Sequence, residues 1–484
     1  MSNLALKETR LALRNSTTRI PFRYGSACLT CCPQAILQAT VEINGKRQTG
    51  YSGDGLPPGW FDKSPEKDFR QQLTDMLEIT AASQKAFANR LRRPTDFFSA
   101  WRAAQHDVEL HANQHQYPPL LGNLGFSLVE RAIIDAICRA NGVSFHTLCR
   151  DNLLGIDAES VHPELAGRQP KDWISAKPLT HIFVRHTVGI GDPLTEADVH
   201  PGDRPADGFP FTLEECLQTD GVRYLKIKLT NKLDYDLERL HTIDSLLNRY
   251  RGDDYNVTLD CNEQYGVIGQ LQQLVAAMRE SESLRTLLSR SLAIEQPLNR
   301  MIAFSADHTK GIRELGETVP VIIDESDGQL ESFRTAVEQG YRGVTSKNCK
   351  GTIKVLLNAG LVWHLNQRGG QRQYIMTGED LCSVGIIPVQ ADLCLAATLG
   401  LEHVERNGHY YHPGLSYLPE QQQRAALAAH PDFYYEHHGR ITPHVQEGRL
   451  HIASLQCPGF GFSVEPDLDR MQPADQWDYD SLDI

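Results

Sequence analysis

Short apolar runs recur along the middle of the chain, and each one ends in charged residues. Three of these runs end in carboxylates, at Asp260, Glu295 and Asp324. The run before them ends in Lys226 and Lys228, and the run after them ends in Lys347. The charged ends lie roughly 23 to 35 positions apart, close to the roughly 30 residues per unit of an eight-fold β/α barrel. The pattern therefore predicts parallel strands whose charged ends meet at one face.

Helical patterns fill the intervals between these runs. Apolar residues three or four positions apart predict helices at residues 234–249, 267–278, 283–290, 330–339 and 351–368. A strand-like run at 181–186 precedes the series, and 373–376 and 403–405 are candidates for the last strands. Strands and helices that alternate in this way indicate a parallel sheet. We predict an α/β protein with a barrel at residues 178–407.

The chain on either side of the barrel mixes strands and helices. Ahead of the barrel we predict a strand at 35–43 with a hairpin turn at Asn44-Gly45, a loop at 51–61, and helices at 71–91 and 124–139. Behind it we predict a helix at 419–429 and strands near 449–455. At 484 residues the chain exceeds the usual size of one core. We expect residues 1–150 to form a second, α+β domain, with residues 408–484 packing back onto it.

The composition excludes some classes of partner. Hydrophobic residues make up 40% of the chain and charged residues 23%, which is ordinary for a soluble globular protein. The net charge of −13 argues against a nucleic-acid partner. No apolar stretch reaches the roughly 18 residues that span a bilayer, and the N-terminus lacks the apolar core of a signal peptide. We expect a cytoplasmic homo-oligomer that binds neither nucleic acid nor membrane.

The eleven cysteines are scattered and lie mostly in apolar runs. Reduced cysteines in the core explain that distribution best. Cys28, Cys31 and Cys32 include a C-x-x-C spacing, but no second pair of cysteines or histidines follows at the interval of a zinc site. We therefore expect no zinc at these cysteines.

The three strand-end carboxylates suggest a metal site. Three oxygen ligands, completed by water and substrate oxygens, suit Mg²⁺ better than zinc. Taken singly, Asp260, Glu295 and Asp324 are each better explained as a helix N-cap or a surface turn. A barrel places all three side by side, which favours the metal. Of two adjacent acids we choose Asp324 as the ligand, and we assign supporting roles to Glu325 and Asn262.

The lysines are candidate acids and bases. Lys226 and Lys228 are two positions apart on a strand, so their side chains point the same way. Like charges in a partly dry site disfavour protonation, so one of the two is a candidate neutral base and the other a partner for a substrate carboxylate. Lys347 is a candidate acid or base on the opposite face. An exposed strand end or loop is the alternative for each lysine, and we expect Lys350 to be exposed or to anchor the turn at Gly351.

The strand-end motifs resemble those of the enolase superfamily. The matching segments are Lys226-Ile227-Lys228, Asp260-Cys261-Asn262-Glu263, Ile294-Glu295-Gln296-Pro297 and Ile323-Asp324-Glu325-Ser326. The helix at 127–136 and the closing segment at 459–466 are also similar, so the resemblance covers most of the chain. An Asp-Glu-Ser at the third ligand strand, with a lysine ending the next strand, looks like the muconate-lactonizing-enzyme branch. The His-Asp dyad of proteins similar to mandelate racemase has no clear match.

The resemblance implies a modified (β/α)7β barrel whose mouth is capped by the N-terminal region and the C-terminal tail. It implies Mg²⁺, and it implies that a substrate carboxylate loses its α-proton to Lys228 or Lys347. Lys226 and the metal would stabilise the resulting enediolate. The implied metal ligands are Asp260, Glu295 and Asp324.

The chain departs from that branch at one position. A glutamate is usual where this sequence has Val384 or Gly385. Acids that offer a replacement lie nearby, at Glu379, Asp380 and Glu405. The capping region supplies candidate contacts to the substrate, with ordinary loop packing as the alternative, at Arg23, Tyr24 and Tyr51.

These observations lead to three functional hypotheses. The first is a Mg²⁺-dependent racemase, epimerase or cycloisomerase that acts on a small carboxylate and uses lysines on opposite faces. The second is an acid dehydratase, a lyase of the same superfamily. The third is a barrel that binds a ligand without catalysis. The sequence leaves the substrate open among hydroxy acids, amino acids, dipeptides and unsaturated ring acids.

Overall fold

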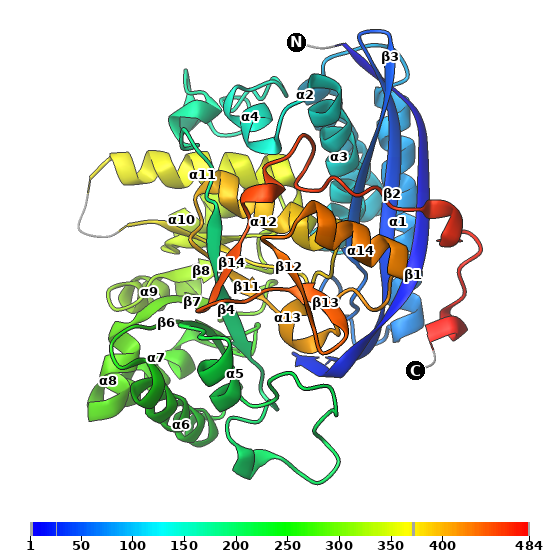
Figure 1. Cartoon of the computed structure of the whole chain (residues 1–484). Coiled ribbons are helices and arrows are strands. Elements are labelled where there is room, and N and C mark those ends of the chain that lie inside the picture. Colours follow the sequence, from blue (N-terminus) through cyan, green and yellow to red (C-terminus); the bar gives the residue numbers. More distant parts are fainter. Residues whose placement is uncertain (1–2, 26, 370–372, 483–484) are drawn as a thin grey trace.

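Eight parallel strands close into a barrel in the computed structural model, which describes residues 3–25, 27–369 and 373–482. β4 pairs with β5 on one side and with β11 on the other, so the ring is closed (Figure 1). The barrel strands are β4 (His181–Val188), β5 (Tyr224–Lys228), β6 (Asn256–Asp260), β7 (Ser291–Glu295), β8 (Val321–Ile323), β9 (Gly343–Ser346), β10 (Ile375–Gly378) and β11 (His403–Arg406). The predicted α/β barrel is confirmed.

Helices alternate with the barrel strands along the chain. Those that follow β5 are α6 (Leu233–Arg251), α7 (Ile268–Glu280), α8 (Glu282–Ser289), α9 (Ala306–Gly316), α10 (Ser332–Gln339), α11 (Thr352–Gln367) and α12 (Ile387–Leu399). A short helix, α5 (Leu213–Thr219), precedes β5. No helix within the described ranges combines the length and the apolar character needed to cross a bilayer.

The register of the barrel aligns the charged strand ends. Lys228 lies opposite Asp260 in the β5–β6 pair, and Asp260 lies opposite Glu295 in the β6–β7 pair. Parallel strands finish at the same face of a barrel, so the side chains that end them converge there. This alignment is the structural basis of the site described below.

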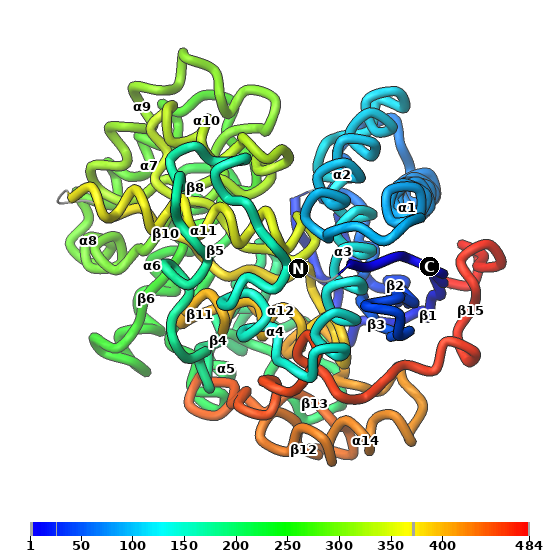
Figure 2. The backbone as a smooth tube through the Cα atoms, turned by 90° about the horizontal axis from the view of Figure 1, so that it is seen from above, coloured from blue at the N-terminus to red at the C-terminus, as the bar shows by residue number. Residues whose placement is uncertain are grey.

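An antiparallel sheet covered by three helices forms a second body beside the barrel (Figure 2). We call it the cap; its elements are β1 (Leu4–Tyr24), β2 (Ala27–Ile43), β3 (Lys46–Gly55), α1 (Phe69–Arg90), α2 (Phe97–Gln114) and α3 (Pro119–Asn141). The predicted hairpin joins β2 to β3. Asn44 and Gly45 there have φ of 50° and 81°, the positive values that a type I′ turn requires.

The cap sheet is longer than the sequence suggested. Residues 21–24 end β1 and residues 51–55 belong to β3, so the loop expected at 51–61 begins only at Leu56. Glycines in β3 concealed this strand, because glycine is unfavourable in a strand unless another backbone comes close. Such an approach occurs here: a Cβ on Gly50 would lie 2.2 Å from the backbone nitrogen of Ala136 in α3.

The last part of the chain touches both bodies. β14 (Arg449–His451) pairs with β4 of the barrel, whereas β15 (Gln472–Pro473) pairs with β1 of the cap. Four elements come between β11 and β14 along the chain: α13 (Gly408–Tyr411), α14 (Glu420–Ala429), β12 (Tyr434–His437) and β13 (Arg440–Pro443). Near α4 (Phe145–Arg150), Phe460 stacks on Phe145 with ring centroids 3.9 Å apart. The boundaries of the three predicted regions stay predictions.

A buried carboxylate joins the cap to the barrel. Glu130 on α3 accepts hydrogen bonds from the backbone N–H groups of Thr352 and Ile353 at 2.7 and 3.0 Å, and from the indole of Trp101 at 2.8 Å. Thr352 and Ile353 open α11, so the carboxylate faces the positive end of that helix. Because α11 closely follows Lys347, this contact ties the strand that carries the lysine to the cap.

We predict that Glu130→Ala lowers the free energy of unfolding by about 3–5 kcal/mol, because it leaves several buried donors without an acceptor. Urea denaturation measures the change. The exposed Glu159→Ala is the control and should change stability by less than about 0.5 kcal/mol. Equal effects of the two substitutions would contradict the assigned role of Glu130.

Candidate active site

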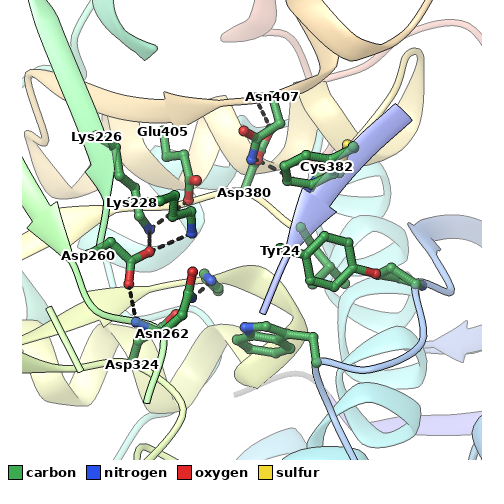
Figure 3. A pocket seen from close by; sticks show the side chains of 15 residues that line it. Tyr24, Lys226, Lys228, Asp260, Asn262, Asp324, Asp380, Cys382, Glu405 and Asn407 are labelled. Atoms are coloured by element: carbon green, nitrogen blue, oxygen red, sulfur yellow. Dashed lines mark hydrogen bonds and ion pairs between the residues drawn. The ribbon is translucent and has the colours of Figure 1, made fainter. Parts of the chain in front are cut away.

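A cavity lies where the cap meets the charged strand ends of the barrel (Figure 3). The cavity has a volume of about 40 Å³, so it is narrow. The cap lines it with Phe22, Tyr24, Pro57 and Trp60. The barrel lines it with Lys226, Lys228, Asp260, Asp324, Lys347 and Glu405, among others. The structure thus brings all three predicted lysines and two of the three predicted metal ligands to one cavity.

The ammonium group of Lys226 lies among four carboxylates. Its Nζ is 2.8 Å from an oxygen of Glu295, 2.8 Å from Glu379, 3.0 Å from Glu405 and 3.1 Å from Asp260. All five side chains are buried. Charges are tolerated in a protein interior only when opposite charges or hydrogen bonds surround them. Lys226 is therefore the counter-ion on which the central acids depend.

The charges of this group bear on the prediction that one of the two paired lysines is neutral. Burial alone would lower the pKa of Lys226, but Asp260, Glu295 and their neighbours raise it well above its ordinary value. The hypothesis of a neutral lysine is therefore wrong for Lys226, because four carboxylates outweigh the like charge of Lys228. Burial, and then the charges of Asp260 and Glu379, raise the pKa of Glu295 well above its usual value. Burial likewise raises the pKa of Glu379 to about 7.

Asp324 is held by two lysines and a threonine. Its Oδ2 is 2.8 Å from Lys347, while its Oδ1 is 2.7 Å from Lys350 and accepts a 2.5 Å hydrogen bond from Thr345. Burial favours the neutral acid, but Lys347 and Lys350 keep the pKa of Asp324 well below its usual value. The prediction that Lys350 is exposed is wrong. The short 3₁₀ turn at Asn348–Lys350 directs this lysine inward, where it is 1% exposed.

Lys228 and Lys347 enter the cavity from opposite sides of the ring. Three strands separate β5 from β9 in either direction around the barrel. The Nζ of Lys228 is 2.6 Å from Asp260. The Nζ of Lys347 lies 4.3 Å from the ring centre of Trp60, within the range of a cation–π contact. A small substrate between them would face one ammonium or amine on each side.

The predicted metal ligands are neighbours, but they do not enclose a single point. Within the described residues, Asp260, Glu295 and Asp324 offer no set of oxygens that all lie within 4.8 Å of one another. The reason lies in their ion-pair partners. Asp260 and Glu295 pair with Lys226, whereas Asp324 pairs with Lys347. A cation shared by all three acids would have to displace some of these lysine contacts.

The chemistry of the donor set nevertheless fits Mg²⁺, which prefers oxygen ligands. Glu295 Oε2 is buried without a hydrogen-bond partner. The same holds for Asn262 Oδ1, in the motif of Asp260, and for Glu325 Oε2, in the motif of Asp324. Asn262 donates to Glu325 at 3.4 Å, which places the two predicted supporting residues together. Buried acceptors without donors are uncommon and call for an explanation such as an ion. These residues therefore fit a metal, provided that the carboxylates rearrange.

Three acids were candidates to replace the missing glutamate, and each has a different position. Glu405 lines the cavity and accepts a 2.8 Å hydrogen bond from Thr187. Asp380 also lines it, but Arg406 neutralises it at 2.5 Å. Glu379 lies deeper and pairs with Arg185. Sequence reasoning missed both arginines, although a charged residue inside a strand of a closed barrel signals a buried partner.

Of the three candidate specificity residues of the cap, one lines the cavity and two do not. Tyr24 faces the cavity and donates a 2.7 Å hydrogen bond to the carbonyl of Pro58. The structure does not bring Arg23 or Tyr51 into the cavity. Arg23 is exposed because successive residues of a strand point to opposite faces. The hydroxyl of Tyr51 instead donates to Glu465 at 3.3 Å.

A salt-bridge clamp fastens the cap loop over the cavity. Glu263, which follows the Asp260 motif, pairs with Arg300 at 2.8 Å and with Lys63 of the cap at 2.5 Å. Arg300 also donates to the backbone carbonyls of Trp60 and Phe61 at 2.9 and 3.0 Å. No sequence signal linked Lys63 to Arg300, because they are far apart in the chain. The clamp holds Trp60 against Lys347.

Comparisons with known proteins identify the fold. No family model matches the sequence, and no curated protein matches it. Solved structures do match it. A mandelate racemase/muconate lactonizing protein from Herpetosiphon aurantiacus aligns with a TM-score of 0.60 and 16% identity, over 96% of this chain and 99% of that one. The chain therefore shares the fold of that protein.

Two further structures with this fold are bound to ligands. A dipeptide epimerase from Enterococcus faecalis, complexed with Mg and the dipeptide L-Leu-L-Tyr, aligns with a TM-score of 0.60 and 13% identity over 95% of this chain and 99% of its own. The muconate lactonizing enzyme from Pseudomonas fluorescens, complexed with muconolactone, aligns with a TM-score of 0.55 and 18% identity over 95% and 97%. Identities this low establish a common fold and leave the reaction to be argued from the site.

We predict that Lys226→Met lowers the free energy of unfolding at pH 7 by about 3–5 kcal/mol, because buried carboxylates lose their counter-ion. Addition of Mg²⁺ should recover part of the loss. Urea denaturation with and without the ion measures both effects. Lys310→Met, on the exposed face of α9, is the control and should be nearly neutral. A stable Lys226→Met protein that ignores Mg²⁺ would refute the counter-ion role.

Proposed function

We propose that this chain is a Mg²⁺-dependent enzyme that removes the α-proton of a small carboxylate substrate, as a racemase, epimerase or cycloisomerase. One observation carries the proposal: Lys228 and Lys347 line the same cavity and reach it from opposite sides of the barrel. A base on one face and an acid on the other are what inversion of a carbon centre requires.

The solved relatives support this class of reaction. The structures with the same fold include a dipeptide epimerase, a muconate lactonizing enzyme and the L-Ala-D/L-Glu epimerase from Bacillus subtilis. All of these names describe isomerisations of carboxylate compounds. Among the hypotheses drawn from the sequence, they favour isomerisation over elimination and over ligand binding alone.

The two lysines have different environments, which suits different roles. Burial lowers the pKa of Lys347, but Asp324 outweighs it and raises that pKa well above its ordinary value. Lys347 is therefore an ammonium group that can donate a proton from its side of the cavity. Among the described residues, Lys228 forms a salt bridge with Asp260 alone, and it is the candidate base on the other side. In a reversible reaction the two roles exchange with the direction.

The acids and the cap supply the remaining requirements. Asp260, Glu295 and Asp324 are the residues that would hold Mg²⁺, and the bound ion would supply positive charge to the developing anion of the substrate. Lys226 adds a fixed positive charge to the wall of the cavity. Tyr24 and Trp60 close it from the cap side, which limits water near the reacting carbon.

Exchange of the α-proton with solvent tests the proposal. Carboxylic acids supplied as separate enantiomers are incubated in D₂O with Mg²⁺, and mass spectrometry measures deuterium uptake. We predict that Lys228→Ala loses exchange of one enantiomer and keeps that of the other, with Lys347→Ala showing the reverse. Each loss should be about 10²- to 10⁴-fold, as expected for removal of a general acid or base.

The control for this assay is Lys310→Ala, which should exchange both enantiomers at the wild-type rate because its side chain is 89% exposed on α9. Loss of a hydroxyl from the substrate, with the corresponding fall in mass, would show a dehydratase instead. Absence of exchange with every class of acid would contradict the proposed enzyme.

Metal removal gives an independent prediction. Dialysis against EDTA should reduce the exchange rate at least about 100-fold, and Mg²⁺ should restore it, because the developing negative charge would otherwise lack its main stabilising charge. The rate is measured against Mg²⁺ concentration. Full activity after chelation would remove the metal from the proposal and leave the lysines to act alone.

A further inference from the structure

Two histidines and a glutamate meet on the outer part of the cap, separate from the barrel cavity. His111 lies in the last turn of α2, His115 caps the end of that helix, and Glu78 faces them from α1. Their Nε2 atoms are 3.8 and 3.6 Å from the same oxygen, Oε1 of Glu78. One ligand atom from each of the three residues lies within 4.8 Å of the other two.

We propose that Glu78, His111 and His115 form a binding site for Zn²⁺ or a chemically similar transition-metal ion. Imidazole and carboxylate are common zinc ligands. Zinc–ligand bonds of about 2.0–2.2 Å in tetrahedral geometry place neighbouring ligand atoms about 3.3–3.5 Å apart. The observed separations of 3.6 and 3.8 Å approach this value, so small side-chain movements would complete the site.

Surrounding contacts already orient the ligand atoms. The Nδ1 of His115 is 2.9 Å from the backbone carbonyl of His111; a proton donated there leaves Nε2 free to bind a metal. Tyr117 donates to Oε2 of Glu78 at 2.8 Å, which leaves Oε1 directed at the histidines. The Nε2 of His111 is shielded from solvent and has no hydrogen-bond partner. Metal-binding histidines and carboxylates are typically held by such outer contacts.

The site would link α1 to α2 and leave one coordination position of the metal ion free for water. Glu78 and His111 form part of the wall of a groove between α1 and α2, which also contains Lys85. Water from this groove can supply the remaining ligand of a tetrahedral ion. The expected consequence is a cap that zinc stabilises.

Titration of the full, tag-free chain with Zn²⁺ tests the proposal, with calorimetry for affinity and Co²⁺ absorption for tetrahedral geometry. His111→Ala and His115→Ala should each weaken this binding at least 10-fold, the lower limit for loss of even an outer contact. Tyr117→Phe should weaken it about 10-fold. His106→Ala, an exposed histidine on the same helix, is the matched control and should bind as the wild type does.

The design separates this site from the barrel and from misfolding. Asp324→Asn should leave Zn²⁺ binding at the cap unchanged, because it alters only the barrel. With Mg²⁺ in excess to fill the barrel centre, melting curves without Zn²⁺ should coincide for wild type, His106→Ala and His111→Ala, while added Zn²⁺ should raise the melting temperature of the first two alone. Equal Zn²⁺ affinity in His106→Ala and His111→Ala, or no saturable binding to the wild type, would overturn the proposal.

Discussion

The balance of buried charge inside the barrel is the constraint on which the site depends. Lys226 reaches four carboxylates from β6, β7, β11 and the turn after β10, so one ammonium group connects elements from around the ring. Opposite charges in a dry interior must be matched, or the group that lacks a partner changes its protonation. The pKa of Glu295 is raised because its negative charge is not fully matched. A divalent cation among these acids would supply the missing positive charge.

Contacts of charged side chains also join the cap to the barrel. The lysine at the rim, Lys347, is held by Asp324 from the barrel and covered by Trp60 from the cap. Trp60 is in turn fixed by the clamp of Lys63, Glu263 and Arg300. A substrate would enter a narrow space whose charges belong to the barrel and whose apolar walls belong to the cap. In the proposed function, the barrel would determine the reaction and the cap would determine the choice of substrate.

The strand-end residues were predictable because the barrel imposes a simple pattern. Each buried strand is a short apolar run, and the charged residue that ends it must lie at the mouth, as Asp260 and Glu295 do. Helix α2 was missed although its buried residues have helical spacing, at Phe97, Trp101, Ala104 and Val108. That miss was avoidable.

Other features depend on contacts that no local pattern reveals. Lys350 is buried because a turn directs it toward Asp324, a residue of another strand. Arg185 is neutralised by Glu379, nearly two hundred positions later. The side-chain directions of the metal ligands were also beyond the sequence, since Lys226 and Lys347 pull them apart. The resemblance predicted which residues gather, whereas the structure showed how their charges pair.

Diffraction from crystals soaked in Mn²⁺, a substitute for Mg²⁺ with an anomalous signal, tests the central claim most directly. The charge balance described above predicts one strong anomalous peak in the barrel, bounded by oxygens of Asp260, Glu295 and Asp324, with the contact between Lys226 and Glu295 lengthened. Crystals without a peak there, and with every lysine contact unchanged, would contradict a cation centre at this mouth.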